Sequence, residues 1–306
     1  MPIPRMQLVL SENWTMTRDL PALVRWAREA EHAGFDSVMI SEHVVLGPDA
    51  GAAGRMANPR EYALPGNQDP FTPWPHSLTL LAAIASVTSR LRLAAAGVLA
   101  PLRHPLVLAR ELGTLDLLSE GRLIVLPTVS WSRDEYAALG VSFADRGRLL
   151  DEHLEIWSLL WGPSPVSYDG AFYSFKDVYF EPKAYRPTGP VLWFGGAGMS
   201  SHLLRRLVRW GSGFNPLGYP GAADMRALAS GLTAHGRTLS EIELVGGTRA
   251  KFPDSDSCAP LEAALEHIPQ RMAEGYTTFC IKPSQFIDDP AKVGEFCREV
   301  MRRVSC

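Results

Sequence analysis

One stretch of the chain, residues 91–131, constrains the fold more than any other. Leu91–Leu99 is a nearly unbroken apolar run, which is typical of a strand buried on both faces of a parallel sheet. Pro105–Ser119 follows with apolar residues at helical spacing, and Glu120-Gly121 is expected to end that helix. Leu123–Thr128 is a second apolar strand. The stretch therefore predicts a strand–helix–strand unit with parallel strands.

The same alternation continues through the rest of the chain. Further short apolar segments, each followed by a segment with helical spacing, are expected to be strands: Met6–Ser11, Ser37–Ile40, Val191–Phe194, Gly213–Pro216, Ile242–Val245 and Thr278–Ile281. Strands that alternate with helices in this way predict a parallel (β/α)8 or TIM barrel. Such barrels commonly take about 250 residues as one domain. We therefore expect residues 1–306 to form a single domain, in which Leu261–Glu274 is one continuous helix.

Two segments interrupt the alternation. Residues 44–75 lack periodicity and are rich in Gly, Pro and Asn, which indicates a functional loop over the end of the barrel. The aromatic residues of this loop, Tyr62, Phe71 and Trp74, indicate that it covers something apolar. Residues 165–188 alternate around the turn Asp169-Gly170, which predicts a hairpin-like insertion before the fifth strand.

The composition excludes several classes of function. A net charge of −3 and the lack of long Lys/Arg runs argue against a surface for nucleic acid or anionic membranes. No segment approaches the roughly 18 consecutive apolar residues of a membrane helix, and the chain enters its first strand without room for a signal peptide. The 4 cysteines, all in the last fifth, do not have zinc-site spacing. We expect a cytoplasmic protein with reduced thiols.

The active site of a parallel barrel is formed by residues just beyond the carboxyl ends of its strands. Those positions hold Glu12 and Trp14, Glu42 and His43, Gly97 and Val98, Thr128, Ser130 and Trp131, Gly195 and Gly196, Asn215 and Leu217, and Lys282. The many aromatic residues favour a flat, conjugated ligand. A metal site is not expected, because His43 is the one histidine clearly placed at a strand end.

The roles of His43 and its neighbour leave alternatives open. His43 is suited to proton transfer or to orienting a substrate, although a histidine at a strand end can also simply bind a neighbouring loop. Glu42 is expected either to hold the histidine or to bind a cofactor hydroxyl. Gly195-Gly196-Ala197-Gly198 precedes a helix, so its amides can bind a phosphate, although such turns also occur for packing alone.

Several motifs together resemble the bacterial luciferase-like family, in particular its branch of coenzyme F420-dependent oxidoreductases. The matching motifs are Ala33-Gly34-Phe35-Asp36-Ser37 before Ser41-Glu42-His43, APLRHPLVLARELGTLDLLSEGRL from Ala100, Asp134-Glu135-Tyr136, Arg146, Asp151-Glu152, Leu160-Trp161, YDGAFYSF and VLWFGGAG. They span essentially the whole chain, and their combination is specific although each one alone is not.

The resemblance implies a (β/α)8 barrel that binds a reduced flavin or deazaflavin at the carboxyl ends of its strands. It implies catalytic roles for His43, near the reactive part of the ring system, and for Glu42 as its acidic neighbour. The implied cofactor-binding residues are Gly97 and Val98, where relatives hold a non-proline cis peptide behind the ring, Thr128 and Ser130, Gly195 and Gly196 at the phosphate, and Leu217 and Gly218 beside them. The expected lining of the substrate pocket is Trp14, Trp74, Trp131 and Trp193.

The chain departs from the family pattern at two places. Leu126–Trp131 replaces the Gly-x-Gly run that relatives commonly carry after the fourth strand, so Trp131 is expected to crowd the space beside the ring. Tyr219-Pro220 stands where some deazaflavin enzymes place a basic residue. The second departure leaves the identity of the cofactor open.

Three functions remain from the sequence. The first is hydride transfer between reduced coenzyme F420 and a small, largely apolar organic substrate, with His43 aiding proton transfer. The second is a two-component monooxygenase that uses reduced FMN and O2, and the third is a flavin-binding protein without catalysis. A separate flavin or F420 reductase is a candidate partner, and a homodimer stays open. No metal, nucleic acid or membrane is expected to bind.

Overall fold

The computed structural model describes residues 3–10 and 19–305. Within them, eight parallel strands close into a barrel in the order β1-β10-β9-β8-β7-β4-β3-β2. Their bounds are β1 Arg5–Val9, β2 Ser37–Ile40, β3 Arg92–Leu99, β4 Leu123–Thr128, β7 Val191–Phe194, β8 Gly213–Phe214, β9 Glu243–Gly247 and β10 Tyr276–Ile281. The predicted (β/α)8 barrel is therefore confirmed, and each predicted strand coincides with an observed one to within a few residues.

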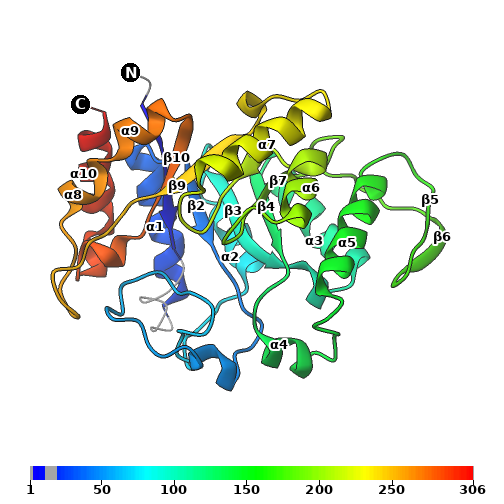
Figure 1. Ribbon diagram of the computed structural model, residues 1–306, viewed down its shortest axis with the longest axis horizontal. Helices are drawn as coiled ribbons and strands as arrows, with labels where there is room; N and C mark the ends of the chain where they lie inside the picture. The colour runs from blue at the N-terminus through cyan, green and yellow to red at the C-terminus, as the bar shows by residue number, and fades with distance from the viewer. Residues whose placement is uncertain (1–2, 11–18, 306) are drawn as a thin grey trace.

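Helices surround this barrel on the outside (Figure 1). The longer ones are α1 Leu20–Ala33, α2 Ser77–Ala85, α3 Pro105–Leu118, α5 Arg146–Leu160, α6 Ser201–Trp210, α7 Ala222–Ala234 and α10 Val293–Val304. Asp19 caps α1 by accepting the amide of Ala22 at 3.2 Å, and Gly34 ends that helix at φ 99°. The other cap expected from the sequence, Thr17, lies outside the described residues. None of the described helices is long and apolar enough to cross a membrane.

The prediction of one helix over Leu261–Glu274 was wrong. The structure has two short helices there, α8 Leu261–Leu265 and α9 Ile268–Ala273. Pro269 lies in the first turn of α9, and the missing amide of proline and the clash of its ring with the preceding turn prevent a continuous helix.

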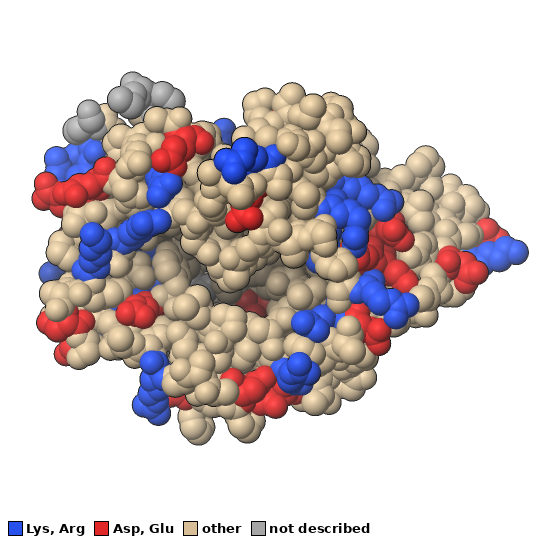
Figure 2. Space-filling model, in the orientation of Figure 1, with Lys and Arg blue, Asp and Glu red and all other residues tan. Residues whose placement is uncertain are grey.

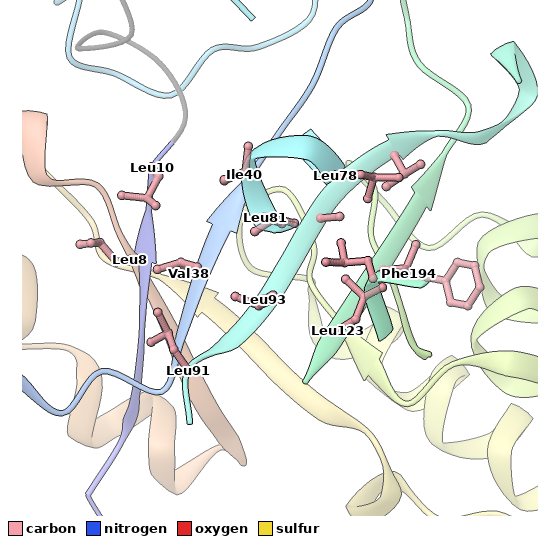
Figure 3. Close-up of a cluster of buried hydrophobic side chains, with 14 of the residues drawn as sticks. Leu8, Leu10, Val38, Ile40, Leu78, Leu81, Leu91, Leu93, Leu123 and Phe194 are labelled. Atoms are coloured by element: carbon pink, nitrogen blue, oxygen red, sulfur yellow. The ribbon is translucent and has the colours of Figure 1, made fainter. Parts of the chain in front are cut away.

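The apolar core has two parts, outside and inside the barrel. Figure 3 shows the outer part, where strand residues such as Leu8, Val38 and Leu93 pack beside Leu81 of α2. The inner part contains Val9, Ala94, Ile124, Trp193, Val245 and Cys280. Because successive strand side chains point to opposite faces, both faces of each strand are buried. This explains why the strands appear in the sequence as continuous apolar runs.

Both insertions are present. β5 Val166–Asp169 and β6 Ser174–Val178 form an antiparallel hairpin, as predicted, which projects to the right in Figure 1. Segment 44–75 contains a short 3-10 helix, Pro48–Gly51, and lies at the bottom of the view with α4, Arg133–Ala138. Since this segment follows β2 and α4 follows β4, both lie beyond the carboxyl ends of the strands.

Candidate active site

His43 lies directly beyond β2, where its imidazole meets a carboxylate from a distant part of the chain. Its Nδ1 is 3.3 Å from Oε2 of Glu135 in α4. The side chain of His43 is 8% exposed and that of Glu135 is 0% exposed. Glu135 belongs to a motif of the family resemblance, but nothing in the sequence alone joined it to His43. It is the main functional residue that sequence reasoning missed.

The carboxylate of Glu135 also accepts two other hydrogen bonds. The amide of Val44 donates to Oε1 at 2.6 Å, and Oγ of Ser130 donates to Oε2 at 3.0 Å. A carboxylate held in this way is an acceptor, so it keeps the proton of a neutral His43 on Nδ1. Nε2 of His43 makes no hydrogen bond with any described residue. The imidazole is thus oriented through Nδ1, while Nε2 keeps its hydrogen-bonding capacity for a ligand.

Two indole rings flank the imidazole. The ring of Trp74, from segment 44–75, lies 5.0 Å from that of His43 at an interplanar angle of 71°. The ring of Trp131, which follows β4, lies 5.5 Å away at 74°. The structure therefore brings together His43, Trp74 and Trp131, which were expected at the mouth of the barrel, the end where the carboxyl ends of its strands lie. Trp14, which was also expected to line the pocket, lies outside the described residues.

The position of Glu42 differs from the expectation. Its carboxylate has other partners than His43: it accepts hydrogen bonds from Nη1 of Arg103 at 2.6 Å, the amide of Leu99 at 3.0 Å and Oγ of Ser77 at 2.5 Å. Burial would raise the pKa of Glu42, but Arg103 and the hydrogen-bond donors hold it below its usual value. Glu42 therefore ties the end of β2 to α2 and to the end of β3, and it is Glu135 that holds the histidine.

Trp193 also differs from the expectation that it lines the substrate pocket. It is fully buried inside the barrel, against the inner core residues. The guanidinium of Arg92, the first residue of β3, lies 5.6 Å from the centre of its ring. This places the indole toward the amino-terminal end of the strands, because the alternation along β7 turns Trp193 inward, below the mouth.

The end of β3 has the backbone feature that the resemblance implied. The peptide bond between Ala96 and Gly97 is cis. A Cβ on Gly97 would lie 2.7 Å from Cγ2 of Thr128, so only glycine fits against β4 at this point. The side chain of Val98 is fully buried in the outer core and does not face the mouth. A ligand at the end of β3 would therefore contact the backbone of this segment and the neighbouring side chain of Thr128.

The glycine turn after β7 packs closely against the turn after β8. A Cβ on Gly195 would lie 1.9 Å from the carbonyl oxygen of Asn215, and the amide of Leu217 donates to the carbonyl of Gly196 at 3.1 Å. Leu217 therefore supports this turn and has no backbone donor left for a phosphate. Gly218 has a φ of 94°, and the space around it is open.

Beyond these contacts the same turn is open. The amides of Ala197 and Gly198 donate to no acceptor in the described part of the chain, and nothing lies within 4 Å of a Cβ built on Gly198. Ser200 caps α6 directly afterwards. Free amides at the amino terminus of a helix suit a phosphate group, so the turn fits the phosphate end of a flavin or deazaflavin.

Positive charge near these turns comes from residues that the sequence did not single out. Tyr219 follows the β8 turn, and its hydroxyl donates to the carbonyl of Gly247 at 2.9 Å. The guanidinium groups of Arg249 and Arg271 lie 4.7 and 4.1 Å from the centre of its ring. Arg249 follows β9, so this charge reaches the mouth from a different strand than the one where relatives carry it.

Segment 44–75 is anchored on one side to α4. The carboxylate of Asp49 accepts Oγ of Ser132 at 3.0 Å and the amide of Arg133 at 2.7 Å. In return, the carboxylate of Asp134 accepts the amide of Asp49 at 2.7 Å. These bonds join the loop to the same helix turn that carries Glu135.

On its other side the segment is anchored to loops near the end of the chain. Nδ2 of Asn58 donates to the carbonyls of Asp254 and Ser257, each at 3.0 Å. Nζ of the buried Lys282, directly after β10, donates to the carbonyl of Glu61 at 3.0 Å. The segment is therefore a fixed wall of the site. Figure 2 shows a hollow near the middle of this face, between the region of α7 above and that of segment 44–75 and α4 below.

In the described part of the chain no group of three or more His, Cys, Asp and Glu side chains is arranged to hold a metal ion.

The chain is similar in sequence to known proteins. Residues 6–278 match the family model described as luciferase-like monooxygenase. An uncharacterized protein of Mycobacterium tuberculosis (strain ATCC 25618 / H37Rv) is 37% identical over 175 residues, which cover 56% of this chain and 59% of that protein. The alignment thus spans less than two thirds of the relative's length.

Solved structures share the fold. Monooxygenase RslO1 from Streptomyces bottropensis has a TM-score of 0.73 at 17% identity, over 97% of this chain and 98% of that chain. An F420-dependent secondary alcohol dehydrogenase, in complex with an F420-acetone adduct, has a TM-score of 0.74 at 14% identity, over 99% of both chains. At these identities the likeness shows the fold alone.

Proposed function

The chain belongs to the luciferase-like monooxygenase family, and from that premise we propose that it transfers a hydride between reduced coenzyme F420 and a small, largely apolar organic substrate. The observation that carries this proposal is the arrangement around His43. Its Nδ1 is held by Glu135, its Nε2 is open, and two indole rings enclose it. An oriented imidazole in a largely apolar site is suited to moving one proton to or from a substrate.

The cofactor would lie along the carboxyl ends of β3, β4 and β7. The backbone at Gly97 and the side chain of Thr128 would form the surface behind the ring system, and the free amides of Ala197 and Gly198 would hold the phosphate. Arg249 would add positive charge near the same end. When bound, a reduced deazaflavin supplies the hydride.

The residues of the chain would move the proton and keep water out of the site. Glu135 keeps the proton of a neutral His43 on Nδ1, so Nε2 accepts a proton from an alcohol or, once protonated, donates one to a carbonyl. Trp74 and Trp131 exclude water from the substrate side of the imidazole and restrict the size of the ligand. Excluding water strengthens each electrostatic contact in the site.

Reduced FMN with O2, delivered by a separate reductase, is the second candidate. It is favoured by Tyr219-Pro220, which follows β8 and replaces the basic residue that some deazaflavin enzymes carry at this place. FMN carries a phosphate but lacks the acidic tail of F420, so it needs less positive charge. This alternative uses the same glycine turn and the same histidine.

Anaerobic equilibrium titration of the purified protein with reduced F420 and with reduced FMN separates the two. We expect tighter binding of F420, and turnover that does not depend on oxygen. Tight binding of reduced FMN without binding of F420, together with oxygen uptake during turnover, would overturn the proposal. A His43→Ala variant that binds the cofactor normally, in a protein whose wild type has no turnover, would indicate a non-catalytic flavin-binding protein.

A further inference from the structure

We propose that a groove on the outside of the barrel, between α1 and α2, binds a linear aliphatic carboxylate. The hydrocarbon chain of the ligand would lie along the groove, and its carboxylate would pair with Arg28. The groove has a volume of about 540 Å³ and is lined by residues of the two helices and of the turns that flank them. It lies apart from His43 and the glycine turns, so the inference goes beyond the proposed function and does not depend on it.

The walls of the groove are apolar although they face solvent. Leu20, at the start of α1, is 39% exposed, and Val87, just beyond α2, is 41% exposed. Between them the lining includes Val24, Leu80 and Ala83. Contiguous apolar surface that is exposed in this way commonly marks a binding site. A hydrocarbon chain in the groove would remove this surface from water.

The sequence of α2 independently indicates that its outer face is covered. The helix, SLTLLAAIA, carries no charged side chain. Leu78, Leu81 and Ile84 are buried in the outer core of the barrel, where Figure 3 shows the first two. A helix with one face in the core normally carries charged residues on the other face. An outer face without charge is therefore expected to have an apolar partner.

The rim of the groove is positively charged. Arg25 and Arg28 of α1 line the groove, and both are exposed. Arg25 pairs with Asp19 at 3.1 Å, whereas Arg28 forms no ion pair or hydrogen bond with any described residue. A guanidinium group binds a carboxylate through two parallel hydrogen bonds. The apolar walls and this unpaired guanidinium together fit a hydrocarbon chain that ends in a carboxylate.

The dimensions of the groove favour a single chain over a helix of a partner protein. The lining residues of α1 run from Leu20 to Arg28, which is about 12 Å along the helix axis. The volume of 540 Å³ spread over this length leaves a mean cross-section of about 45 Å². A helix with its side chains is about 10 Å across and needs roughly 80 Å². An extended hydrocarbon chain is narrow enough to enter.

A second copy of the chain suits the groove less well. A two-fold interface uses the same surface of both copies, so it would place the two arginine rims against each other. Like charges that face each other across an interface are unfavourable. A carboxylate ligand satisfies the apolar walls and the basic rim at once.

The groove borders the network that supports the active site. Pro75 and His76 line one end of it, and Trp74, which flanks His43, directly precedes them. Nε2 of His76 lies 3.3 Å from Nη2 of Arg103, the residue that ties the end of β2 in place. A ligand in the groove would therefore hold the segment that leads into the site.

Isothermal titration calorimetry of the full chain tests the inference. The probes are decanoate, octanoate and decyltrimethylammonium, each below the concentration at which it forms micelles. We expect one decanoate to bind per chain, and octanoate to bind up to about 15-fold more weakly because two fewer methylene groups are buried. Decyltrimethylammonium has the same chain as decanoate but a positive head, so the arginine rim should prevent its saturable binding.

Variants locate the site. Arg28→Gln should weaken decanoate binding by about 2–5-fold, as for one exposed ion pair. Ala83→Phe, at an exposed position, should fill the groove and abolish saturable binding. Arg226→Gln is the matched control, because Arg226 of α7 is exposed and does not line the groove. It should keep the wild-type dissociation constant. Thermal unfolding of each variant checks that the fold is intact.

The opposing outcomes are distinct. Equal decanoate affinity in wild type and Ala83→Phe would place the ligand elsewhere, for instance in the mouth, and overturns the inference. Equal binding of decanoate and decyltrimethylammonium, or an unchanged affinity in Arg28→Gln, overturns the pairing with the carboxylate. Absence of decanoate binding, together with a dimer in sedimentation velocity that Ala83→Phe dissociates, would assign the groove to a second copy instead. The titrations contain no cofactor, so their result is independent of the F420 and FMN titrations.

Discussion

Nδ1 of His43 and Oε2 of Glu135 lie 3.3 Å apart, although 92 positions separate the two residues in the chain. This contact joins the end of β2 to the first turn of α4. It sets which nitrogen of the imidazole faces the ligand, and it makes α4 part of the site.

Replacing Glu135 by Gln should lower kcat by about 10–100-fold, as is typical when a partner that orients a histidine is lost. The amide can donate a proton as well as accept one, so the tautomer of His43 is no longer fixed. The pH profile of kcat should change, while the dissociation constant of the cofactor stays within a few-fold of wild type. Ser130→Ala removes only one donor to the carboxylate and should have a smaller effect. Unchanged kinetics in Glu135→Gln would show that the contact is structural.

Glu42→Ala should destabilise the fold by about 3–5 kcal/mol, because it leaves Arg103 without its buried partner. Urea unfolding at pH 7 measures this. The pKa of Glu42 lies below its usual value of 4.5 in the folded protein, because Arg103 and the hydrogen-bond donors outweigh the opposing effect of burial. Its contribution to stability is therefore fully present above about pH 4.5 and is lost as the pH falls through the lowered value. A variant that unfolds at the same urea concentration as wild type at pH 7 would contradict this role.

Arg92→Ala should also destabilise the barrel by about 3–5 kcal/mol. At the amino-terminal end of the strands Arg92 pairs with Asp36 and, at 2.7 Å, with Glu243. The variant leaves both carboxylates partly buried and without this partner. Arg298→Ala, which removes an exposed pair with Glu29, should cost at most about 1 kcal/mol. Cofactor affinity, measured alongside unfolding, should not change in either variant, since both sites lie away from the mouth.

The two glycines of the β7 turn should respond differently to alanine. A Cβ at Gly195 would collide with the carbonyl of Asn215, whereas one at Gly198 meets open space. Gly195→Ala should destabilise the fold by about 1–3 kcal/mol or more, as overpacking does. Gly198→Ala should keep wild-type stability. Thermal unfolding of the pair compares them, and equal melting temperatures would speak against the close approach of β7 and β8.

Trp131→Ala should open the pocket toward larger substrates. Removing the indole that lies 5.5 Å from His43 leaves room for a bulkier group beside the imidazole. We expect kcat/KM to rise for branched substrates and to fall for the smallest ones, by about 10-fold in each direction, because pocket contacts of this size discriminate by 1–3 kcal/mol. A uniform loss for all substrates would argue against a role in selecting size.

Much of the fold follows from the sequence. The alternation of apolar strands with amphipathic helices determined the (β/α)8 architecture, because a strand covered by helices must be apolar on both faces. The breaks in that alternation located both insertions. The position of His43 at a strand end, and of Trp74 and Trp131 among the aromatic residues of the mouth, could also be predicted. The interruption between α8 and α9 was missed although Pro269 marks it in the sequence, because the apolar spacing of Leu261–Glu274 continues through the break.

Other features depended on the tertiary structure. The apolar run of β7 does not tell which face is inside, because both faces are buried; the closure of the barrel turned Trp193 inward, below the mouth. Glu42 and His43 are neighbours in the sequence, but successive side chains of an extended segment point to opposite sides. Glu42 therefore joins the structural network around Arg103. The carboxylate beside His43 is that of Glu135, and it lies there only because the fold places α4 next to the end of β2.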